Sequence, residues 1–265
     1  MIAAAHAKIN LGLAVGPLRP DGRHEVVTVL QRIALADTIS LEAADALCVD
    51  GFAADTLVRA ALQAIADAAK VEPRWRAQID KRIPVAGGLG GGSSDAATAL
   101  ILANRLLPTP LPIAQLHALA AGLGSDVPFF LTPGPKLARG SGAVLEPLHL
   151  PQDYTVVLLL PSGAHKRSTA EVYHAYRGEE GFAARAADLA ALASLGASAD
   201  LAAFPGNDLA RSEHVGALLD TGAFRAEVSG AGPTLYGLFA DAVTANAAAA
   251  ALSEIGATWT TIPAW

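Results

Sequence analysis

A stretch of small residues between positions 84 and 95 has the composition of an anion-binding loop. Five of the six residues 87–92 are glycine, two serines follow, and an alanine-rich run starts at Ala96. Glycine has no Cβ and tolerates positive φ, so its backbone N–H groups can close around an anion. The helix expected after the loop adds unpaired N–H groups and a positive dipole end. The spacing therefore predicts a phosphate-binding loop leading into a helix.

Other interpretations of this loop are weaker. No Gly-Lys-Ser/Thr closes it, so it is not a Walker A loop, and its glycines lack the G-x-G-x-x-G spacing of dinucleotide-binding and protein kinase loops. The plain structural alternative is a turn before a helix, with Ser93 or Ser94 as N-cap. An isolated glycine pair would favour that turn, whereas five glycines in six positions favour close approach to a ligand.

Lys8 and Asn10 are candidates for contact with a substrate. They stand two residues apart in the predicted strand Ala7–Val15 and therefore on the same strand face. A lone lysine is more commonly a solvent-facing charge. On an otherwise apolar segment, however, the pair could present hydrogen-bond donors to a ligand.

Asp126 lies in a turn, Gly122–Pro128, between a predicted helix and a short apolar run. A carboxylate in a turn is often a helix cap. It can also orient or deprotonate a substrate hydroxyl, which contributes about 10²–10⁴-fold to rate. The local sequence leaves both roles open for Asp126.

His24 and Gly230 are two further residues of interest in turns. His24 follows an Asp-Gly turn, and Gly230 lies in Gly-Ala-Gly-Pro at 230–233. Each is interpreted most simply as a turn residue. Gly230 has a second interpretation, a backbone wall beside bound phosphates.

Composition limits the class of protein. The chain has 265 residues, 52% of them hydrophobic, a net charge of −6 and the single cysteine Cys48. An acidic chain is not expected to attract nucleic acid or anionic membranes broadly, and one cysteine allows no internal disulfide. The apolar runs are too short to span a bilayer, and the N-terminus lacks the features of a signal peptide. We therefore expect a cytoplasmic globular protein.

Hydrophobic periodicity predicts a segregated α+β fold. A boundary near residue 150 divides the chain into expected domains 1–150 and 151–265. The predicted strands are 7–15, 25–35, 38–43, 75–83, 154–160, 225–229, 235–239 and 258–262, and the predicted helices are 57–69, 95–107, 112–123, 169–176, 182–195, 214–219 and 242–255.

Taken together, these motifs resemble the GHMP kinase superfamily. Residues 84–94 are similar to its phosphate-binding signature, and 229–233 are similar to its third motif. Five other stretches, at 7–11, 19–24, 37–40, 79–84 and 124–128, are similar to the member family that phosphorylates a cytidine-diphosphate-linked methylerythritol in the non-mevalonate isoprenoid pathway. The matches run in order over most of the chain, from residue 7 to about 239.

The resemblance implies a two-lobed fold with an active-site cleft between the lobes, and ATP-dependent phosphorylation of the substrate's 2-hydroxyl. Asp126 would be base or orienter for that hydroxyl, with Lys8 stabilising charge. Mg²⁺ would arrive with the nucleotide, and a homodimer is a candidate assembly. The substrate-binding residues implied are Asn10, His24, Tyr173 and Gly230. The ATP-binding residues implied are Lys81, Pro84, Val85, Ala86, Gly87, Gly88, Leu89, Gly90, Gly91, Gly92, Ser93 and Ser94.

Two residues depart from the family pattern. Arg23 replaces an aromatic residue expected to stack on cytosine, although a guanidinium can also stack. Asp55 stands where an asparagine is expected near adenine, and a carboxylate cannot donate as an amide does. The alternatives are a related kinase acting on homoserine, mevalonate or a sugar, and a non-catalytic nucleotide-binding protein. The presence of both Lys8 and Asp126 argues against the last.

Overall fold

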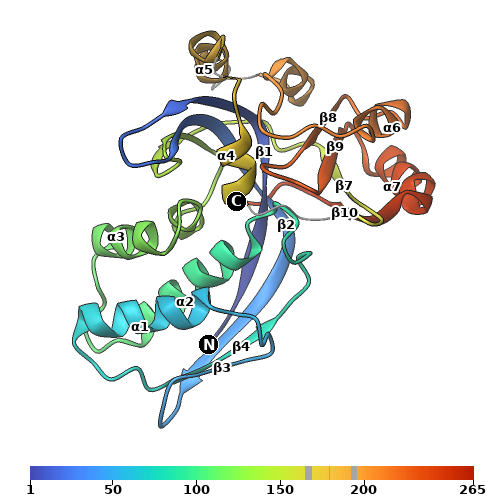
Figure 1. Cartoon of the computed structure of the whole chain (residues 1–265). Coiled ribbons are helices and arrows are strands. Elements are labelled where there is room, and N and C mark those ends of the chain that lie inside the picture. Colours follow the sequence, from blue (N-terminus) through green and yellow to red (C-terminus); the bar gives the residue numbers. More distant parts are fainter. Residues whose placement is uncertain (165–168, 179, 192–195) are drawn as a thin grey trace. The chain divides into compact units, whose positions relative to one another are not determined.

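The computed structural model describes residues 1–164, 169–178, 180–191 and 196–265 (Figure 1). The chain divides into two compact units that interleave along the sequence. Unit 1 contains Met1–Ala7, Leu35–Val85 and Gly90–Pro133, and unit 2 contains Lys8–Ala34, Ala86–Leu89 and Gly134–Trp265. The domain boundary expected near residue 150 remains a prediction.

Two long strands, β1 (Ile2–Leu18) and β2 (His24–Ala43), pair with each other and contribute residues to both units. The sequence predicted two strands where β2 is one. Asp37, which lies between the two predicted strands, is fully buried. A buried carboxylate needs hydrogen-bond partners, and the N–H groups of Arg82 and Ile83, in the loop after β4, donate to it. Because its side chain is satisfied in this way, Asp37 can lie in the interior of a continuous strand.

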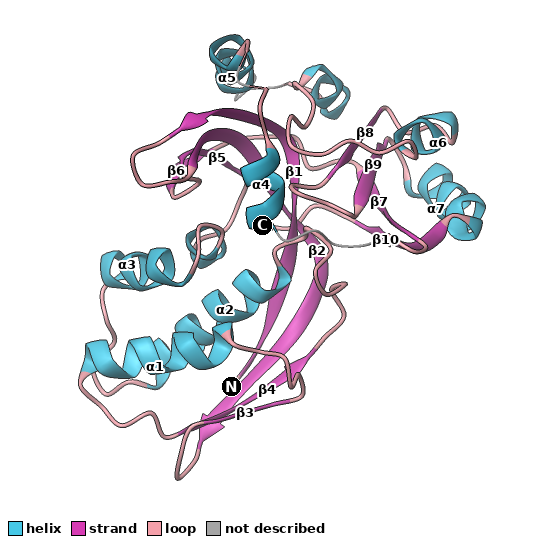
Figure 2. Cartoon of the chain, viewed as in Figure 1, coloured by secondary structure: helices cyan, strands magenta, loops and turns pink. Residues whose placement is uncertain are grey.

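Unit 1 contains the C-terminal part of β2, from Leu35 to Ala43, and three α-helices. There β2 pairs antiparallel with β4 (Trp75–Asp80), and β4 pairs parallel with the short β3 (Cys48–Asp50). Side chains of β4 alternate buried and exposed, as expected for a strand with one face on the core. The helices α1 (Leu57–Ala69), α2 (Gly91–Leu106) and α3 (Ile113–Leu123) pack on one another and on the 3₁₀ helix η1 (Val127–Leu131) (Figure 2).

Unit 2 contains the rest of β2, which pairs with β5 (Lys136–Gly140), itself paired with β6 (Val144–Pro147). A separate antiparallel sheet has the order β10-β7-β9-β8. These strands are β7 (Thr155–Pro161), β8 (Arg225–Val228), β9 (Leu235–Phe239) and β10 (Gly256–Thr261). An apolar cluster that includes Val157, Leu218, Phe239 and Ala248 joins this sheet to α6 (Val215–Asp220) and α7 (Ala242–Ala251). The short helices α4 (Thr169–Ala175) and α5 (Phe182–Ala191) complete unit 2, with 3₁₀ turns η2 (Ser198–Ala203) and η3 (Leu252–Glu254).

Most predicted elements are confirmed. Apart from the two predicted strands that form β2, the predicted and observed elements differ in where they begin or end. The helix 57–69 and the 225–239 hairpin are present as expected. The predicted strand 75–83 ends at Asp80, because the N–H groups of Arg82 and Ile83 donate to a side chain instead of a neighbouring strand. Residues 192–195 of the predicted helix 182–195 lie outside the described part of the chain. Among the helices that are described, none has the length and apolarity needed to cross a bilayer.

Candidate active site

The glycine-rich loop has positive φ at every second residue. Ala86, Gly88 and Gly90 have φ values of 64°, 80° and 72°. Alternation of this kind turns successive N–H groups toward one side of the chain, which creates a concave site for anions. Gly88 cannot be replaced easily, because a Cβ there would fall 2.5 Å from the carbonyl oxygen of Ser229.

Three consecutive carbonyls of this loop are fixed by hydrogen bonds within unit 2. The oxygen of Gly87 accepts from the N–H of Thr234, that of Gly88 from the Ser229 hydroxyl, and that of Leu89 from the N–H of Lys8. The N–H groups of residues 87–90 donate to no acceptor within the described residues. The carbonyl side of the loop is therefore anchored, while its N–H side is left for a ligand.

The helix α2 starts at Gly91, four residues earlier than predicted, and its N-cap is Gly90. No side chain in the described chain caps it, which rules out the alternative interpretation in which Ser93 or Ser94 is the N-cap. The left-handed φ of Gly90 redirects the chain into the helix before the serines are reached. Uncapped N–H groups in the first turn suit an anionic ligand.

Lys8 and Asn10 lie on the same face of β1, as predicted, and are hydrogen-bonded to each other. The ammonium Nζ of Lys8 donates to Oδ1 of Asn10 over 2.7 Å, and each residue is only 5% exposed. Gly230 lies against this pair, because a Cβ on Gly230 would be 3.1 Å from Asn10 Oδ1 and 3.4 Å from Lys8 Nζ. The structure thus brings three predicted residues together in unit 2.

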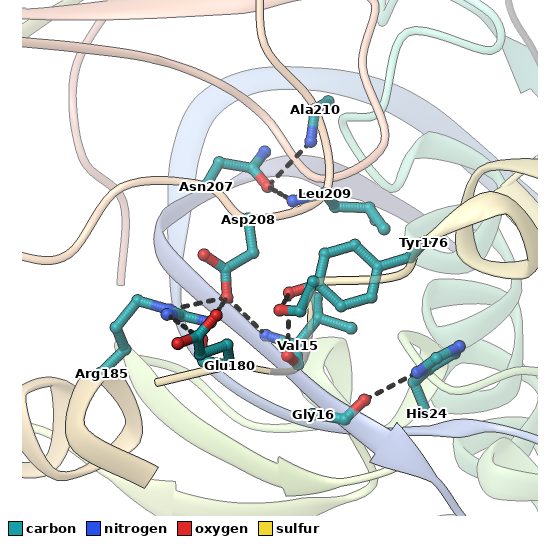
Figure 3. Close-up of polar contacts among 11 residues, drawn as sticks. Val15, Gly16, His24, Tyr176, Glu180, Arg185, Asn207, Asp208, Leu209 and Ala210 are labelled. Carbon is teal, nitrogen blue, oxygen red and sulfur yellow. Dashed lines mark hydrogen bonds and ion pairs between the residues drawn. The ribbon is translucent and has the colours of Figure 1, made fainter. Parts of the chain in front are cut away.

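The loop that carries Gly230 is held by Asn207, a residue that the sequence motifs did not single out. Its side-chain amide donates to the carbonyl oxygens of Val228 and Gly230, at 2.8 and 2.7 Å. Its Oδ1 accepts from the N–H groups of Leu209 and Ala210 (Figure 3). Asn207 therefore fixes the backbone beside Lys8 and Asn10.

In unit 1, Lys81 is held between two buried carboxylates. Its ammonium contacts Asp37 and, at 2.8 Å, Asp95 in the first turns of α2. The other oxygen of Asp37 accepts from the N–H groups of Arg82 and Ile83. The Lys81–Asp95 pair therefore joins the segment that enters the glycine-rich loop to the helix that leaves it.

The ionisation of this cluster follows from burial and charge. Burial raises the pKa of Asp95 to about 7, against the attraction of Lys81 and with the repulsion of Asp37. Burial alone would lower the pKa of Lys81, but hydrogen bonds to Asp37 and Asp95 raise it above its ordinary value. Lys81 is thus a stable cation that is paired with carboxylates of the protein itself.

Asp126 occupies the N-cap position of η1 and is half-buried. The sequence left a capping role open, but within the described chain this side chain makes no capping hydrogen bond to η1. The turn is closed instead by the backbone, where the N–H of Phe129 donates to the carbonyl of Asp126. The Asp126 carboxylate is therefore not used to cap the helix that follows it.

His24 lies in unit 2 with its ring hydrogen-bonded to the backbone of Gly16 (Figure 3). Its Nδ1 is 2.7 Å from the carbonyl oxygen of Gly16. A carbonyl only accepts, so Nδ1 carries the proton and Nε2 of the neutral ring is an acceptor. The rings of Tyr173 and Tyr176 lie 6.2 and 5.8 Å from the His24 ring, between centroids.

Tyr176 and Asp208 hold this aromatic group in place, and sequence reasoning missed both. The Tyr176 hydroxyl lies against the carbonyls of Val15 and Gly178. Asp208 accepts from the N–H of Val15 and forms an ion pair with Arg185. Both residues come from segments far from β1 in the sequence, so no local pattern could connect them with it.

Asp55, one of the departures from the family pattern, acts as a helix cap. Its two carboxylate oxygens accept from the N–H groups of Val58 and Arg59 in the first turn of α1. An asparagine would offer one acceptor oxygen in place of two. The aspartate is therefore accounted for by the start of α1.

Comparison with known proteins identifies the class to which this fold and site belong. The family models described as GHMP kinases N terminal domain and GHMP kinases C terminal match residues 56–134 and 213–258. A solved mevalonate kinase shares the fold at 12% identity and a TM-score of 0.76, covering 100% of this chain and 99% of that one. The expected α+β GHMP kinase fold is thereby confirmed.

More similar relatives narrow the class. The 4-diphosphocytidyl-2-C-methyl-D-erythritol kinases of Pelotomaculum thermopropionicum and Gloeobacter violaceus are each 40% identical over 94% of this chain, covering 92% and 89% of their own lengths. A crystal structure of 4-(cytidine 5'-diphospho)-2C-methyl-D-erythritol kinase matches at 33% identity and a TM-score of 0.81, covering 100% of both chains. The chain belongs to the 4-diphosphocytidyl-2-C-methyl-D-erythritol kinase family, as its motifs predicted.

Proposed function

We propose that this protein transfers the γ-phosphoryl group of ATP to the 2-hydroxyl of 4-diphosphocytidyl-2-C-methyl-D-erythritol. The observation that carries the proposal is the setting of residues 87–90, whose carbonyls are anchored while their N–H groups donate to no described residue. Donors in this arrangement fit a polyphosphate chain. The relatives at 40% identity carry the name of this kinase, which supports the choice of acceptor.

In this proposal the remaining ATP-binding residues continue the same loop. Residues 84–94 surround the phosphates, with the first turn of α2 supplying further N–H groups. The segment at Lys81 lies near the adenine, while the Lys81 side chain keeps its ion pairs with Asp37 and Asp95. Phosphoryl transfer depends mainly on positioning and charge stabilisation, which is what a fixed set of N–H donors supplies.

Asp126 is proposed to accept or orient the proton of the attacking hydroxyl, and Lys8 to stabilise negative charge on the reacting oxygens. Asn10 and Gly230 line the acceptor beside Lys8. For the cytidine end, His24 offers Nε2 as an acceptor for the exocyclic amine of cytosine. Tyr173 offers an aromatic face near His24.

Mg²⁺ belongs to the proposal as a companion of ATP that neutralises phosphate charge. The described residues contain no group of three or more His, Cys, Asp or Glu side chains that could hold a metal ion. We therefore assign the ion no protein ligand.

The test is an acceptor panel with the full-length protein, ATP and Mg²⁺. The acceptors are 4-diphosphocytidyl-2-C-methyl-D-erythritol, homoserine, mevalonate and galactose, and ADP release is measured for each. We expect release above the background with the first acceptor alone. Release with another acceptor would move the protein to a different substrate, and release with none would contradict the kinase proposal.

A further inference from the structure

Three buried polar side chains form a hydrogen-bonded chain that starts at Lys8. Lys8 Nζ donates to Asn10 Oδ1 over 2.7 Å, Asn10 Nδ2 donates to Thr28 Oγ1 over 2.8 Å, and Thr28 donates to the carbonyl oxygen of Gly12 over 2.7 Å. Thr28 lies on β2 and is 5% exposed, like Lys8 and Asn10. We propose that Thr28 is a positioning residue for the phosphoryl transfer, acting through Asn10 on Lys8.

The hydrogen-bond directions in this chain are the same whether they are assigned from the Lys8 ammonium, which only donates, or from the Gly12 carbonyl, which only accepts. The carbonyl of Gly12 can only accept, so the Thr28 hydroxyl uses its one proton there. Thr28 Oγ1 must then accept from Asn10, which turns Nδ2 of the amide toward Thr28. Oδ1 of Asn10 is left facing the Lys8 ammonium.

The anchor of the chain is rigid. A Cβ at Gly12 would fall 2.6 Å from the Leu189 side chain and 2.8 Å from the carbonyl oxygen of Pro205, so the backbone there is closely packed on both. The other end is equally confined, because Gly230 lies against Lys8 Nζ and Asn10 Oδ1. Both ends of the chain of bonds are therefore closely packed.

Without the Thr28 hydroxyl, Nδ2 of Asn10 loses its buried acceptor, and within this chain of bonds only the Lys8 ammonium still orients the amide. An amide held at one end has more rotational freedom than one held at both. The acceptor Oδ1 that faces the Lys8 ammonium is then less precisely placed. Small displacements of a catalytic group reduce turnover by as much as about 10²-fold, so Thr28 contributes to rate without touching a substrate.

This inference rests on the proposed role of Lys8, and the experiment separates the two. Steady-state kinetics compare the wild type with Thr28→Val, which keeps the shape but loses the hydroxyl, and with Thr28→Ser, which keeps the hydroxyl. Thr155→Val is the matched control, since Thr155 is also a buried strand threonine of unit 2 and lies outside this chain of bonds. Thr28→Ala replaces Thr28→Val if the latter does not fold.

We expect Thr28→Val to lower kcat at least 10-fold with the KM for ATP changed less than 2-fold, while Thr28→Ser and Thr155→Val stay within about 3-fold of the wild type. In ¹⁵N-labelled protein, the side-chain NH₂ signals of Asn10 should shift or broaden in Thr28→Val and be retained in Thr28→Ser. A wild type inactive on every acceptor would refute the proposed function. An active wild type with unchanged kcat in Thr28→Val, or equal losses in Thr28→Val and Thr28→Ser, would overturn the role of Thr28.

Discussion

Lys8 is buried and Lys81 is partly buried, and the ammonium group of each donates hydrogen bonds to oxygen atoms of the protein. Lys8 donates to the amide oxygen of Asn10, which is a neutral acceptor. Lys81 contacts the carboxylates of Asp37 and Asp95, which balance its charge. The bond to Asn10 orients the Lys8 ammonium, in keeping with its proposed role of stabilising negative charge on the reacting oxygens.

Loss of either proposed catalytic group should affect turnover more than nucleotide binding. We expect Asp126→Asn to lower kcat by about 10²–10⁴-fold and Lys8→Ala by about 10²–10³-fold. The dissociation constant for ATP, measured by titration calorimetry, should change less than 5-fold in both. Asp67→Asn and Lys70→Ala, at exposed positions of α1 and its end, serve as controls. Near-normal turnover in either test variant would remove that residue from the mechanism.

The acceptor Nε2 of His24 should matter for the cytidine end of the substrate. His24→Phe keeps a ring beside Tyr173 and Tyr176 but has no acceptor. We expect the KM for the cytidine substrate to rise about 10-fold, equivalent to one hydrogen bond of ~1.4 kcal/mol. The kcat and the KM for ATP should stay near wild type. An unchanged KM for the cytidine substrate would place His24 outside the binding site.

At the scale of elements, the glycine-rich loop requires glycine at position 88 for two reasons, a positive φ and close contact with neighbouring backbone. Its φ is +80°, and its Cα faces backbone carbonyls at Ser229 and Gly232. Gly163 has a similar φ of +72°, but a Cβ added there would meet no atom of the described residues within 4 Å. The two glycines together separate the effect of backbone strain from that of steric contact.

Gly88→Ala should therefore raise the KM for ATP at least 10-fold, because the new methyl group pushes the loop away from the carbonyls that anchor it. Gly163→Ala should leave this KM within about 2-fold of wild type. Both variants carry the strain of positive φ, about 1 kcal/mol or slightly more. Equal effects on KM in the two variants would show that the loop is not sensitive to this contact.

Asp37, inside β2, connects this strand to the loop after β4 through hydrogen bonds to the N–H groups of Arg82 and Ile83. Removing this carboxylate leaves Lys81 and two backbone N–H groups without their buried acceptor. We expect Asp37→Ala to lower the free energy of unfolding by about 3–5 kcal/mol, measured by urea denaturation. Asp80→Ala breaks an exposed pair with Arg82 and should cost less than about 1 kcal/mol. A small loss in Asp37→Ala would mean that the cluster does not stabilise unit 1.

At the scale of the whole molecule, the net charge of −6 opposes the approach of a polyphosphate. Affinity must then come from local N–H donors and from counterions. Because the proposed donors are the N–H groups of residues 87–90, we expect the phosphates, rather than the adenosine part, to be the main source of stabilisation by nucleotide.

Mg²⁺-ADP at a hundred times its dissociation constant should add about 2.7 kcal/mol of stability, which raises the thermal midpoint by roughly 5–10 °C for a chain of this size. Differential scanning fluorimetry measures the shift. Adenosine at the same concentration should shift the midpoint by less than about 2 °C, because it lacks the phosphates that the loop N–H groups bind. A similar shift with adenosine would indicate that the phosphates are not the principal anchor.

Secondary-structure elements set by local sequence could be predicted, whereas features that depend on long-range contacts could not. Helix α1 and the β8–β9 hairpin were predictable because local periodicity and turn residues determine them. The end of β4 was not, since it depends on Asp37, which is 45 residues from Arg82 in the sequence. The start of α2 was predicted four residues too late for a related reason: the φ of Gly90 is decided by how the loop is anchored, and glycine itself permits either sign.

By itself, the sequence predicted a phosphate-binding loop and determined the shared face of Lys8 and Asn10 and the family, because these depend on residue type and near-neighbour spacing. Only the tertiary structure decided which carbonyls anchor the loop, which carboxylates hold Lys81, and that Thr28 and Asn207 orient the residues beside Lys8. Such contacts join segments that are far apart in the chain, and each depends on which donor and acceptor the fold brings together. No local pattern carries that information.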